Sequence, residues 1–401
     1  MPKSLDIAIA GAGPAGLATA LSLHRDSHRV HIFERFESAR PIGSGLILQP
    51  TGQAVMAELG LLDAIRALGR PLDRLIGHDA HSGRTVLDMR YAALPRLGRG
   101  LGIHRAALFD VLHGAVVESG IPISIGAEIT ALEGGVLELG RRREGPFDLV
   151  VDAMGSNSPL RACVRGPARR KALPFAAIWG TVPWVDEGFD GSALMQRYVR
   201  SSVMIGVLPI GRQTTGGPEL AAFFWSVKAD DYDSLVRGGY GAWSARVADL
   251  WPATAPHLAT LGDFSSLSLA RYQHQTAAVP VGDGLAAVGD AAHSTSPQLG
   301  QGANMALLDA RALTVTLRDP DLGNALERYA ALRRSHVRLY QAMSLALTPF
   351  YQSESRFLPI LRDLVVPIAT SVPPLPQFLA ALVAGKLLNP LKRLGLSAVR
   401  I

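Results

Sequence analysis

Three glycines near the start of the chain have the spacing of a phosphate-binding turn. Gly11, Gly13 and Gly16 follow the pattern G-x-G-x-x-G, and the acidic Glu34 lies about 20 residues further on. In such a turn the first glycine permits a tight bend, the second lets the backbone approach a pyrophosphate, and the third lets a helix pack on a strand. The acidic side chain would accept a ribose hydroxyl and disfavour a 2′-phosphate. The pattern predicts a bound dinucleotide, FAD or NAD, against the alternative of a glycine turn that holds no ligand.

The segments around this turn predict a strand, a helix and a second strand. The apolar run DIAIA (6–10) suits a strand buried on both faces, PAGLATALSLHR (14–25) carries helix formers, and RVHIFE (29–34) alternates. A pyrophosphate would lie at the N-terminus of the helix, where unpaired N–H groups and the helix dipole favour negative charge. Near the other end of the chain, GLAAVGDAAH (284–293) again indicates a buried strand, and residues 302–317 a helix.

A different pattern separates these two ends. Residues 175–275 are rich in aromatic and β-favouring segments, with one helix expected near 230–250, and a hairpin is expected around Ser82-Gly83. After residue 345 the chain is apolar, helical and interrupted by prolines. We therefore predict an α/β fold with three parts. A Rossmann-like nucleotide-binding domain comprises residues 1–75, 98–174 and 270–345, an inserted mixed β-sheet substrate domain comprises 76–97 and 175–269, and a C-terminal helical segment comprises 346–401.

The composition limits the class of protein. The 401 residues are 48% hydrophobic and only 18% charged, which makes an apolar substrate or a membrane contact worth considering, yet no apolar run reaches the length of a spanning helix. The N-terminus leads directly into a strand without a signal peptide, and the single cysteine, Cys163, excludes an internal disulfide and a Cys-rich metal site. These features predict a cytoplasmic protein without a metal. The net charge is +6, but the basic runs at 141–143 and 169–171 are short, so nucleic-acid binding is not expected.

Three separated segments resemble the para-hydroxybenzoate hydroxylase family of FAD-dependent monooxygenases, which includes ubiquinone-biosynthesis hydroxylases. They are the glycine turn with Glu34, DLVVDAMGSNSPLR (148–161) and GLAAVGDAAHSTSPQLGQGANMALLDA (284–310). The resemblance covers most of residues 1–345 and implies a FAD-binding domain of the GR2 type, with tightly but non-covalently bound FAD and NAD(P)H as a transient co-substrate. It implies that FAD contacts Gly11, Gly13, Pro14, Ala15, Gly16, Glu34, Arg35, Arg40, Arg105, Asp290, Pro297, Gly300, Gln301, Gly302, Ala303 and Asn304.

The resemblance gives Asp290 the role of holding the ribityl chain of FAD. Asp290 ends an otherwise apolar strand, where an unpaired carboxylate would be costly and the hydroxyls of a polyol would satisfy it. Gly300 and Gly302 allow close backbone approach, and the N-terminus of the helix near Ala303 would stabilise an anionic reduced flavin. The alternative for Asp290 is a helix cap.

Other polar residues have weaker support. Arg105 would reach the pyrophosphate or the flavin edge, and Arg40 the approach to the ribityl chain and nicotinamide; the alternative for each is a surface arginine. The glycine-rich segment 43–49, with Gly43, Gly45 and Gln49, belongs to the same region. His293 and Pro297 are candidates for catalysis beside the flavin, although a lone histidine in such a turn is more often a hydrogen-bonded structural group.

The second segment departs from the family pattern. The family strand ends in Asp-Gly, and that Asp contacts FAD and the passing nicotinamide, whereas this chain has Met154-Gly155. Asp152 lies one pleat period earlier, so it would point to the same side of the strand but further back. Met154 cannot accept a hydrogen bond of comparable strength, which puts the nicotinamide path in doubt.

The resemblance implies a monooxygenase that uses NAD(P)H and O2, through a flavin C4a-hydroperoxide, to hydroxylate an aromatic small molecule that is phenol-like or lipophilic. The alternatives are an epoxidase or a flavin-dependent reductase on the same fold, or a flavin-binding protein impaired in turnover at Met154. Trp179, Phe223, Phe224 and Trp225 are expected to be mostly core, with one or two facing the substrate. The C-terminal segment is expected to cap the substrate domain or form a homodimer, in preference to a peripheral membrane contact; the chain is expected to be a monomer or homodimer.

Overall fold

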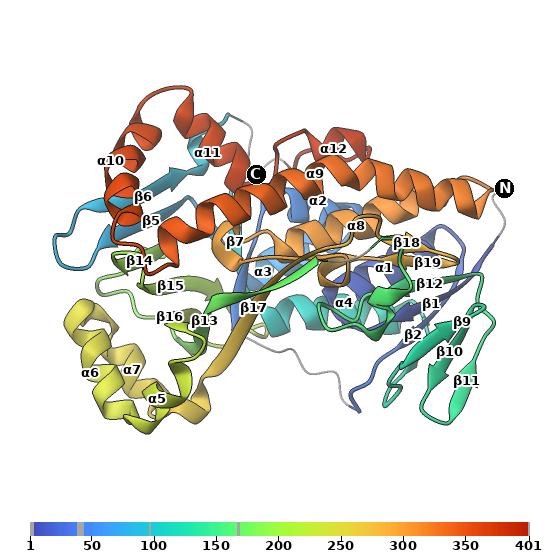
Figure 1. The fold of residues 1–401 in the computed structure, drawn as a ribbon, viewed down its shortest axis with the longest axis horizontal. Coiled ribbons are helices and arrows are strands. Elements are labelled where there is room, and N and C mark those ends of the chain that lie inside the picture. Colours follow the sequence, from blue (N-terminus) through green and yellow to red (C-terminus); the bar gives the residue numbers. More distant parts are fainter. Residues whose placement is uncertain (1–3, 38–43, 96–97, 167–168, 400–401) are drawn as a thin grey trace.

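A computed structural model describes residues 4–37, 44–95, 98–166 and 169–399, and its first layer is a six-stranded sheet (Figure 1). The strand order is β18-β19-β12-β1-β2-β8, and all neighbours are parallel except β18 and β19. The strands are β1 (Asp6–Ala10), β2 (Arg29–Phe33), β8 (Ile123–Ser124), β12 (Leu149–Asp152), β18 (Val281–Gly282) and β19 (Leu285–Ala287).

Both faces of this sheet are covered, which explains why β1 is apolar at every inner position. Ile7 and Ile9 face the core that also contains residues of two C-terminal helices and of five earlier helices, whereas Ala8 and Ala10 lie in a second core under a small antiparallel sheet. The five earlier helices are α1 (Pro14–Arg25), α2 (Pro50–Glu58), α3 (Leu62–Leu68), α4 (Arg105–Glu118) and α8 (Gly302–Thr316), and the small sheet contains β9 (Ala131–Glu133), β10 (Val136–Leu139) and β11 (Arg142–Glu144). The strand and helix predicted at 6–10 and 14–25 are confirmed.

The second layer is an eight-stranded mixed sheet in the order β20-β17-β13-β16-β15-β14-β5-β6, in which only β14 and β5 pair in parallel. Its strands are β5 (Arg74–Asp79), β6 (Thr85–Arg90), β13 (Arg169–Pro183), β14 (Ala193–Val199), β15 (Val203–Gly211), β16 (Leu220–Lys228), β17 (Ser268–Thr276) and β20 (His293–Ser294). The predicted hairpin is the β5–β6 pair. A separate three-stranded sheet has the order β3 (Gly45–Leu48), β7 (Gly100–His104) and β4 (Arg70–Leu72).

One face of the eight-stranded sheet packs on a group of helices. The single helix predicted near 230–250 is wrong, because the chain forms two helices there, α5 (Tyr232–Arg237) and α6 (Tyr240–Leu250), followed by α7 (Ala255–Leu261). The break falls at Gly238-Gly239, where Gly239 has a φ of 86°, a left-handed conformation that interrupts a helix.

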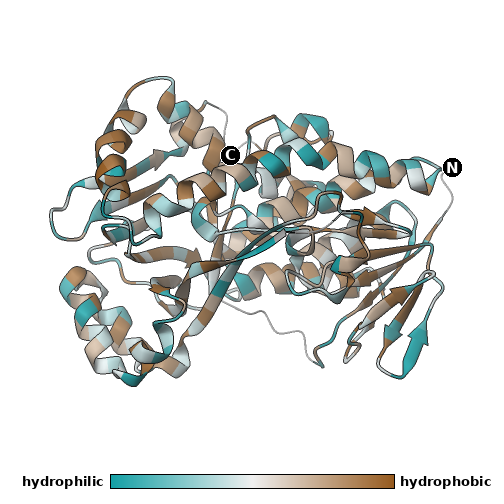
Figure 2. Ribbon diagram, in the orientation of Figure 1, coloured by the Kyte–Doolittle hydropathy of each residue, from teal (hydrophilic) through white to brown (hydrophobic). Residues whose placement is uncertain are grey.

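The C-terminal helices join the two layers. The 30-residue helix α9 (Leu322–Tyr351) runs alongside both (Figure 1), and α10 (Leu358–Ser371), α11 (Leu375–Val383) and α12 (Pro390–Arg393) follow it. Figure 2 shows that many residues of α10 and α11 are hydrophobic. Among the described residues no single helix has the length and apolarity to cross a bilayer; α10 and α11, bent by 100° at their junction, meet that test only as a pair. The fold class predicted from the sequence is confirmed.

Candidate active site

The carboxyl ends of four parallel strands meet at one edge of the six-stranded sheet. The N–H of Gly11 donates to the carbonyl of Phe33 (2.8 Å), and that of Ala153 donates to the carbonyl of Ala10 (2.8 Å). The N–H of Val288 donates to the Asp152 carbonyl (2.9 Å), so the loops after β1, β2, β12 and β19 lie together. In open parallel sheets, ligands bind at this kind of edge.

The three glycines of the first turn have different surroundings. A Cβ atom on Gly16 would lie 2.0 Å from the Gly11 carbonyl oxygen, and one on Gly11, whose φ is +103°, would lie 2.8 Å from the Ala153 oxygen. A Cβ on Gly13 would meet nothing within 4 Å. The first and third glycines are therefore explained by the packing of the chain itself, whereas Gly13 faces open space.

The N-terminus of α1 points its N–H groups at that space. Gly13 is the N-cap, so no N-cap side chain accepts from the first N–H groups of the helix; Pro14 follows, and the first turn contains no acidic residue. The first N–H groups of a helix have no partner within the helix, so this end can bind an anion. Ala15, in the same turn, is half-buried.

Glu34 closes the side of the turn. One carboxylate oxygen accepts the N–H of Ala12 (2.8 Å) and the other accepts that of Phe36 (3.1 Å), which leaves lone pairs on both oxygens. Arg35 is exposed and places its guanidinium 4.6 Å from the centre of the Phe36 ring. Arg40 and Gly43 lie outside the described residues, and Gly45 packs tightly against Ile210.

The second glycine corner touches the first. A Cβ on Gly289, which has a φ of +59°, would lie 3.2 Å from the Cβ of Ala15 in α1 and 3.1 Å from that of Ala306 in α8. A Cβ on Gly302 at the start of α8 would lie 3.9 Å from an Asp290 carboxylate oxygen. Segments almost 300 residues apart in the chain thus border one space.

The Asp290 carboxylate lies on a recessed surface. The side chain is accessible to solvent, but the protein that surrounds it removes much of its hydration, and this desolvation raises its pKa. The charges of His293 and Arg105 only partly offset the effect. Among the described residues no group donates a hydrogen bond to it. A solvent-reachable carboxylate with raised pKa and free acceptor capacity is suited to bind hydroxyl groups.

Arg105 connects this recess with the eight-stranded sheet. It begins α4, and its positive charge lowers the pKa of both Asp290 and Tyr272, so it lies near both. Burial nonetheless raises the pKa of Tyr272 to about 12, and its hydroxyl accepts a hydrogen bond from Trp179 Nε1 (2.8 Å). The Trp179 ring lies 4.6 Å from the ring of Phe224. The four aromatic residues singled out in the sequence divide between the two faces of the sheet: Trp179 and Phe224 on this one, Phe223 and Trp225 toward the α5–α7 side.

The side chain of Asn304 forms hydrogen bonds that fix the turn before α8. Pro297 starts the one-turn helix Pro297–Leu299, and Gly300 follows with a φ of +60°. The Asn304 side chain accepts the N–H of Gln49 (2.7 Å) and donates to the carbonyls of Ile47 and Gly300 (3.1 and 3.0 Å). Only its backbone N–H, with those of Gly302 and Ala303, remains for a ligand, since Gln301 makes no side-chain cap.

Gln49 carries a buried donor without a partner. Its amide oxygen accepts the hydroxyl of Tyr91 (2.7 Å), which fixes the amide so that Nε2 faces away from Tyr91. Among the described residues nothing accepts from Nε2, and a Cβ on Gly300 would lie 3.9 Å from it. The fully buried Gln49 therefore carries a donor near Gly300 that no described residue satisfies.

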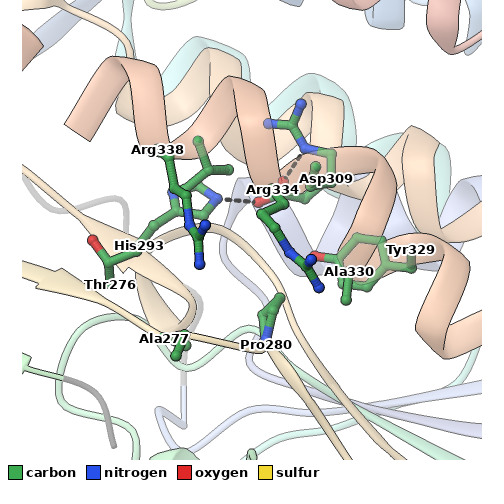
Figure 3. Close-up of a pocket in the computed structure, with 12 residues that line it drawn as sticks. Thr276, Ala277, Pro280, His293, Asp309, Tyr329, Ala330, Arg334 and Arg338 are labelled. Carbon is green, nitrogen blue, oxygen red and sulfur yellow. Dashed lines mark hydrogen bonds and ion pairs between the residues drawn. The ribbon is translucent and has the colours of Figure 1, made fainter. Parts of the chain in front are cut away.

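Behind the second corner lies an ionic cluster that the sequence did not reveal (Figure 3). Asp309 of α8 accepts from Arg333 Nε (2.6 Å), from the N–H of Gly289 (2.9 Å) and pairs with His293 Nε2 (2.6 Å). Burial raises the pKa of Asp309, but the charges of His293 and Arg333 outweigh it and hold the pKa at about 2. The sequence feature that could have indicated this cluster is the presence of two charged residues, Asp309 and Arg333, among the apolar residues of helix faces that are buried. The histidine considered for catalysis is thus held in a structural pair.

Asp152 also serves the chain itself. It is fully buried, its oxygens accept the Ser158 hydroxyl (2.6 Å) and the Met154 N–H (3.1 Å), and burial raises its pKa to about 6 despite these bonds. Asp152 therefore stabilises the turn that follows β12, and the half-buried Met154 occupies the position at the strand end.

Comparisons with known proteins agree with this arrangement. A family model described as FAD binding domain matches residues 4–340. The chain is 32% identical over 358 residues to the phenazine 1,6-dicarboxylic acid hydroxylase of Lysobacter antibioticus, covering 82% of this chain and 86% of that protein. It is 26% identical over 352 residues to the FAD-dependent urate hydroxylase of Klebsiella pneumoniae, with the same coverage.

Solved structures show the same fold. Klebsiella pneumoniae HpxO, complexed with FAD and uric acid, superposes with a TM-score of 0.81 at 22% identity, covering 96% of this chain and 98% of that one. A mutant of 2-methyl-3-hydroxypyridine-5-carboxylic acid oxygenase superposes with a TM-score of 0.79 at 21% identity, covering 98% of both chains.

Proposed function

Since this chain belongs to the FAD binding domain family of flavoprotein monooxygenases, we propose that it hydroxylates a small, largely apolar aromatic molecule with O2, using NAD(P)H as reductant. One observation carries the proposal. The open space at Gly13 and the Asp290 carboxylate border a continuous edge, because the corners that hold them touch at Ala15 and Gly289. An edge with an anion site at one corner and a free carboxylate at the other suits an extended ligand with both phosphate and hydroxyl groups.

The residues at this edge fit FAD group by group. The N–H groups at the start of α1 would bind the pyrophosphate, Glu34 the ribose hydroxyls, and Asp290 the ribityl hydroxyls. The uncapped N-terminus of α8 would stabilise negative charge that develops close to Gly302. When bound, FAD supplies the redox chemistry, and the chain binds it, orients it and excludes water.

The substrate would lie between this edge and the eight-stranded sheet. Trp179 and Phe224 supply an aromatic wall there, and Tyr272 and Arg105 supply polar groups at its margin. The unpartnered Nε2 of Gln49 would donate to a carbonyl or hydroxyl oxygen beside Gly300. Apolar walls with a few fixed polar groups are the usual lining of small-molecule sites, and they keep water away from reactive groups.

A second candidate function rests on Met154. Because the thioether replaces a carboxylate, and Asp152 is engaged with Ser158, the strand end offers no acidic group to a passing nicotinamide. A flavoprotein that NAD(P)H reduces poorly would have this feature. An epoxidase or a flavin-dependent reductase is compatible with the same fold.

The test uses the purified full-length chain. We expect a yellow protein whose oxidation of NADH or NADPH accelerates, with matching O2 uptake, when phenols or N-heteroaromatic acids are added. A yellow protein that responds to none of them would favour the impaired flavoprotein, and a colourless protein that binds NAD would refute the FAD assignment.

We further propose that the enzyme acts in the cytoplasm as a monomer or homodimer. Its single cysteine, the exposed Cys163, supports a reducing compartment. Sedimentation velocity at several concentrations would measure the oligomeric state.

A further inference from the structure

The helices α10 and α11 carry a row of exposed apolar side chains, which we call the apolar ridge. In α10, Ile360, Leu364 and Ile368 are 58%, 60% and 56% exposed, and their spacing of four residues places them on one helix face. The ridge consists of Phe357, Ile360, Leu364, Val365, Ile368, Val372, Leu375 and Phe378. Figures 1 and 2 show these helices at the edge of the molecule, coloured as hydrophobic. Contiguous exposed apolar surface of this kind marks an interaction site.

The ridge has almost no capacity for polar contacts. No charged residue occurs from 364 to 385. The hydroxyl of Thr370 is used on the carbonyl of Val366 (3.0 Å), and Arg362 turns inward, where it pairs with Asp363 (2.8 Å) and donates to the carbonyl of Arg200 (2.8 Å). A protein partner would ordinarily form about one hydrogen bond per 100–200 Å² of interface, so an apolar edge whose polar side chains are limited to Ser371 and Gln377 beside Thr370 suits hydrocarbon better.

We propose that the apolar ridge binds the surface of a lipid bilayer that contains anionic phospholipids. One cation stands next to each end of the ridge segment in the chain: the exposed Arg356 precedes Phe357, and the half-buried Lys386 follows α11. The chain as a whole carries a net charge of +6. Apolar side chains inserted below the headgroups, with cations at their level, are the features of a peripheral interfacial anchor.

The inner side of the same helices reaches the candidate active site. Ala380 and Val383 of α11 lie in the core that contains Phe224, and the carbonyl of Val383 accepts a hydrogen bond from the Gln301 side chain. The next carbonyl, of Ala384, accepts from the Thr51 hydroxyl (3.2 Å). The pair α10–α11 therefore stands between the ridge and the substrate space. This arrangement favours an aromatic substrate that partitions into membranes. That inference about the substrate rests on the proposed function, whereas the inference of a membrane contact is independent of it.

The experiment measures binding of the flavin-loaded full chain to vesicles of phosphatidylcholine with and without phosphatidylglycerol, by co-sedimentation. Leu364→Glu combined with Ile368→Glu should weaken binding at least about tenfold, because each carboxylate would enter the apolar layer. Val117→Glu on α4, where the side chain is 57% exposed, is the matched control and should change binding by less than about twofold. Flavin content and far-ultraviolet circular dichroism should be equal in all three proteins.

Three results would overturn the proposal. The wild-type chain could stay in the supernatant with both kinds of vesicle, or the control variant could lose binding as fully as the ridge variant. In the third, the ridge variant would convert a concentration-dependent dimer into a monomer without changing vesicle binding, and a second copy of the chain would then be the partner. Failure of the proposed function is a separate result, since a colourless chain can still bind vesicles.

Discussion

Replacing Gly13 with alanine should change the affinity for FAD without changing the stability of the fold. Gly13 has φ −71° and ψ 173°, an extended conformation that alanine adopts without strain, and its Cβ would meet nothing within 4 Å. Alanine restricts the unfolded chain, which stabilises by about 0.4–1 kcal/mol, and it is a poorer N-cap than glycine by a comparable amount. The unfolding free energy of the flavin-free protein should therefore stay within about 1 kcal/mol of the wild-type value.

FAD binding should respond very differently. A methyl group at the α1 N-terminus would displace a pyrophosphate from the N–H groups, and hydrogen bonds to charged groups contribute about 1.5–3 kcal/mol each. Losing one or two of them costs about 3 kcal/mol, which is a loss of about 100-fold in affinity. The assay is fluorescence titration of the flavin-free protein with FAD, beside its thermal unfolding.

Two other glycines serve as controls. Gly114→Ala, within α4 and equally open, should leave both FAD affinity and fold intact. Gly16→Ala should damage both, because its Cβ would lie 2.0 Å from the Gly11 carbonyl oxygen and α1 would have to shift. Unchanged FAD affinity in Gly13→Ala would refute the assignment of the pyrophosphate to this turn.

Three further predictions concern buried and recessed carboxylates. Asp290→Asn should weaken FAD binding at least about tenfold without destabilising the flavin-free fold, as equilibrium titration and thermal unfolding will measure; full affinity would contradict its role. The folded-state pKa of Asp152, about 6, lies above its ordinary value of 3.8, so its contribution favours folding in acid and is lost as the pH rises through 6. Asp152→Asn should thus remove the decline of the unfolding free energy between about pH 4 and pH 8, which amounts to up to about 3 kcal/mol in the wild type, in urea titrations; an equal decline in both proteins would argue against it. Asp309→Ala leaves Arg333 buried without its partner and should cost about 3–5 kcal/mol, whereas a loss under about 1 kcal/mol in urea titrations would show that the pair is dispensable.

The local elements could be predicted because their signals lie within a few residues. The strand 6–10, the glycine turn and the helix 14–25 follow from apolar pattern, glycine spacing and the proline at the first helical position. The meeting of the turn with Gly289 could be expected only from the family resemblance, since nothing in either segment specifies the other.

The remainder of the site depends on contacts between distant elements. The partner of His293 is Asp309 on α8, whose other carboxylate oxygen pairs with Arg333 on α9, a set that no local pattern brings together. The inward turn of Asp152 toward Ser158 likewise required the fold of the loop after β12, and the outward position of Arg35 required the path of the chain after β2.

The interleaving of the two large sheets constrains how this enzyme can be recombined with its relatives. The six-stranded sheet takes strands from residues 6–33, 123–152 and 281–287, and the eight-stranded sheet from 74–90, 169–276 and 293–294. No single crossover point yields a chimera that takes one sheet whole from one parent and the other sheet whole from the second parent. Exchange of the whole substrate-facing sheet needs three segments transplanted together. The helix α9 then has to match both parents at once, because it donates from Tyr329 to the Ala287 carbonyl and from Gln341 to the Gln275 carbonyl.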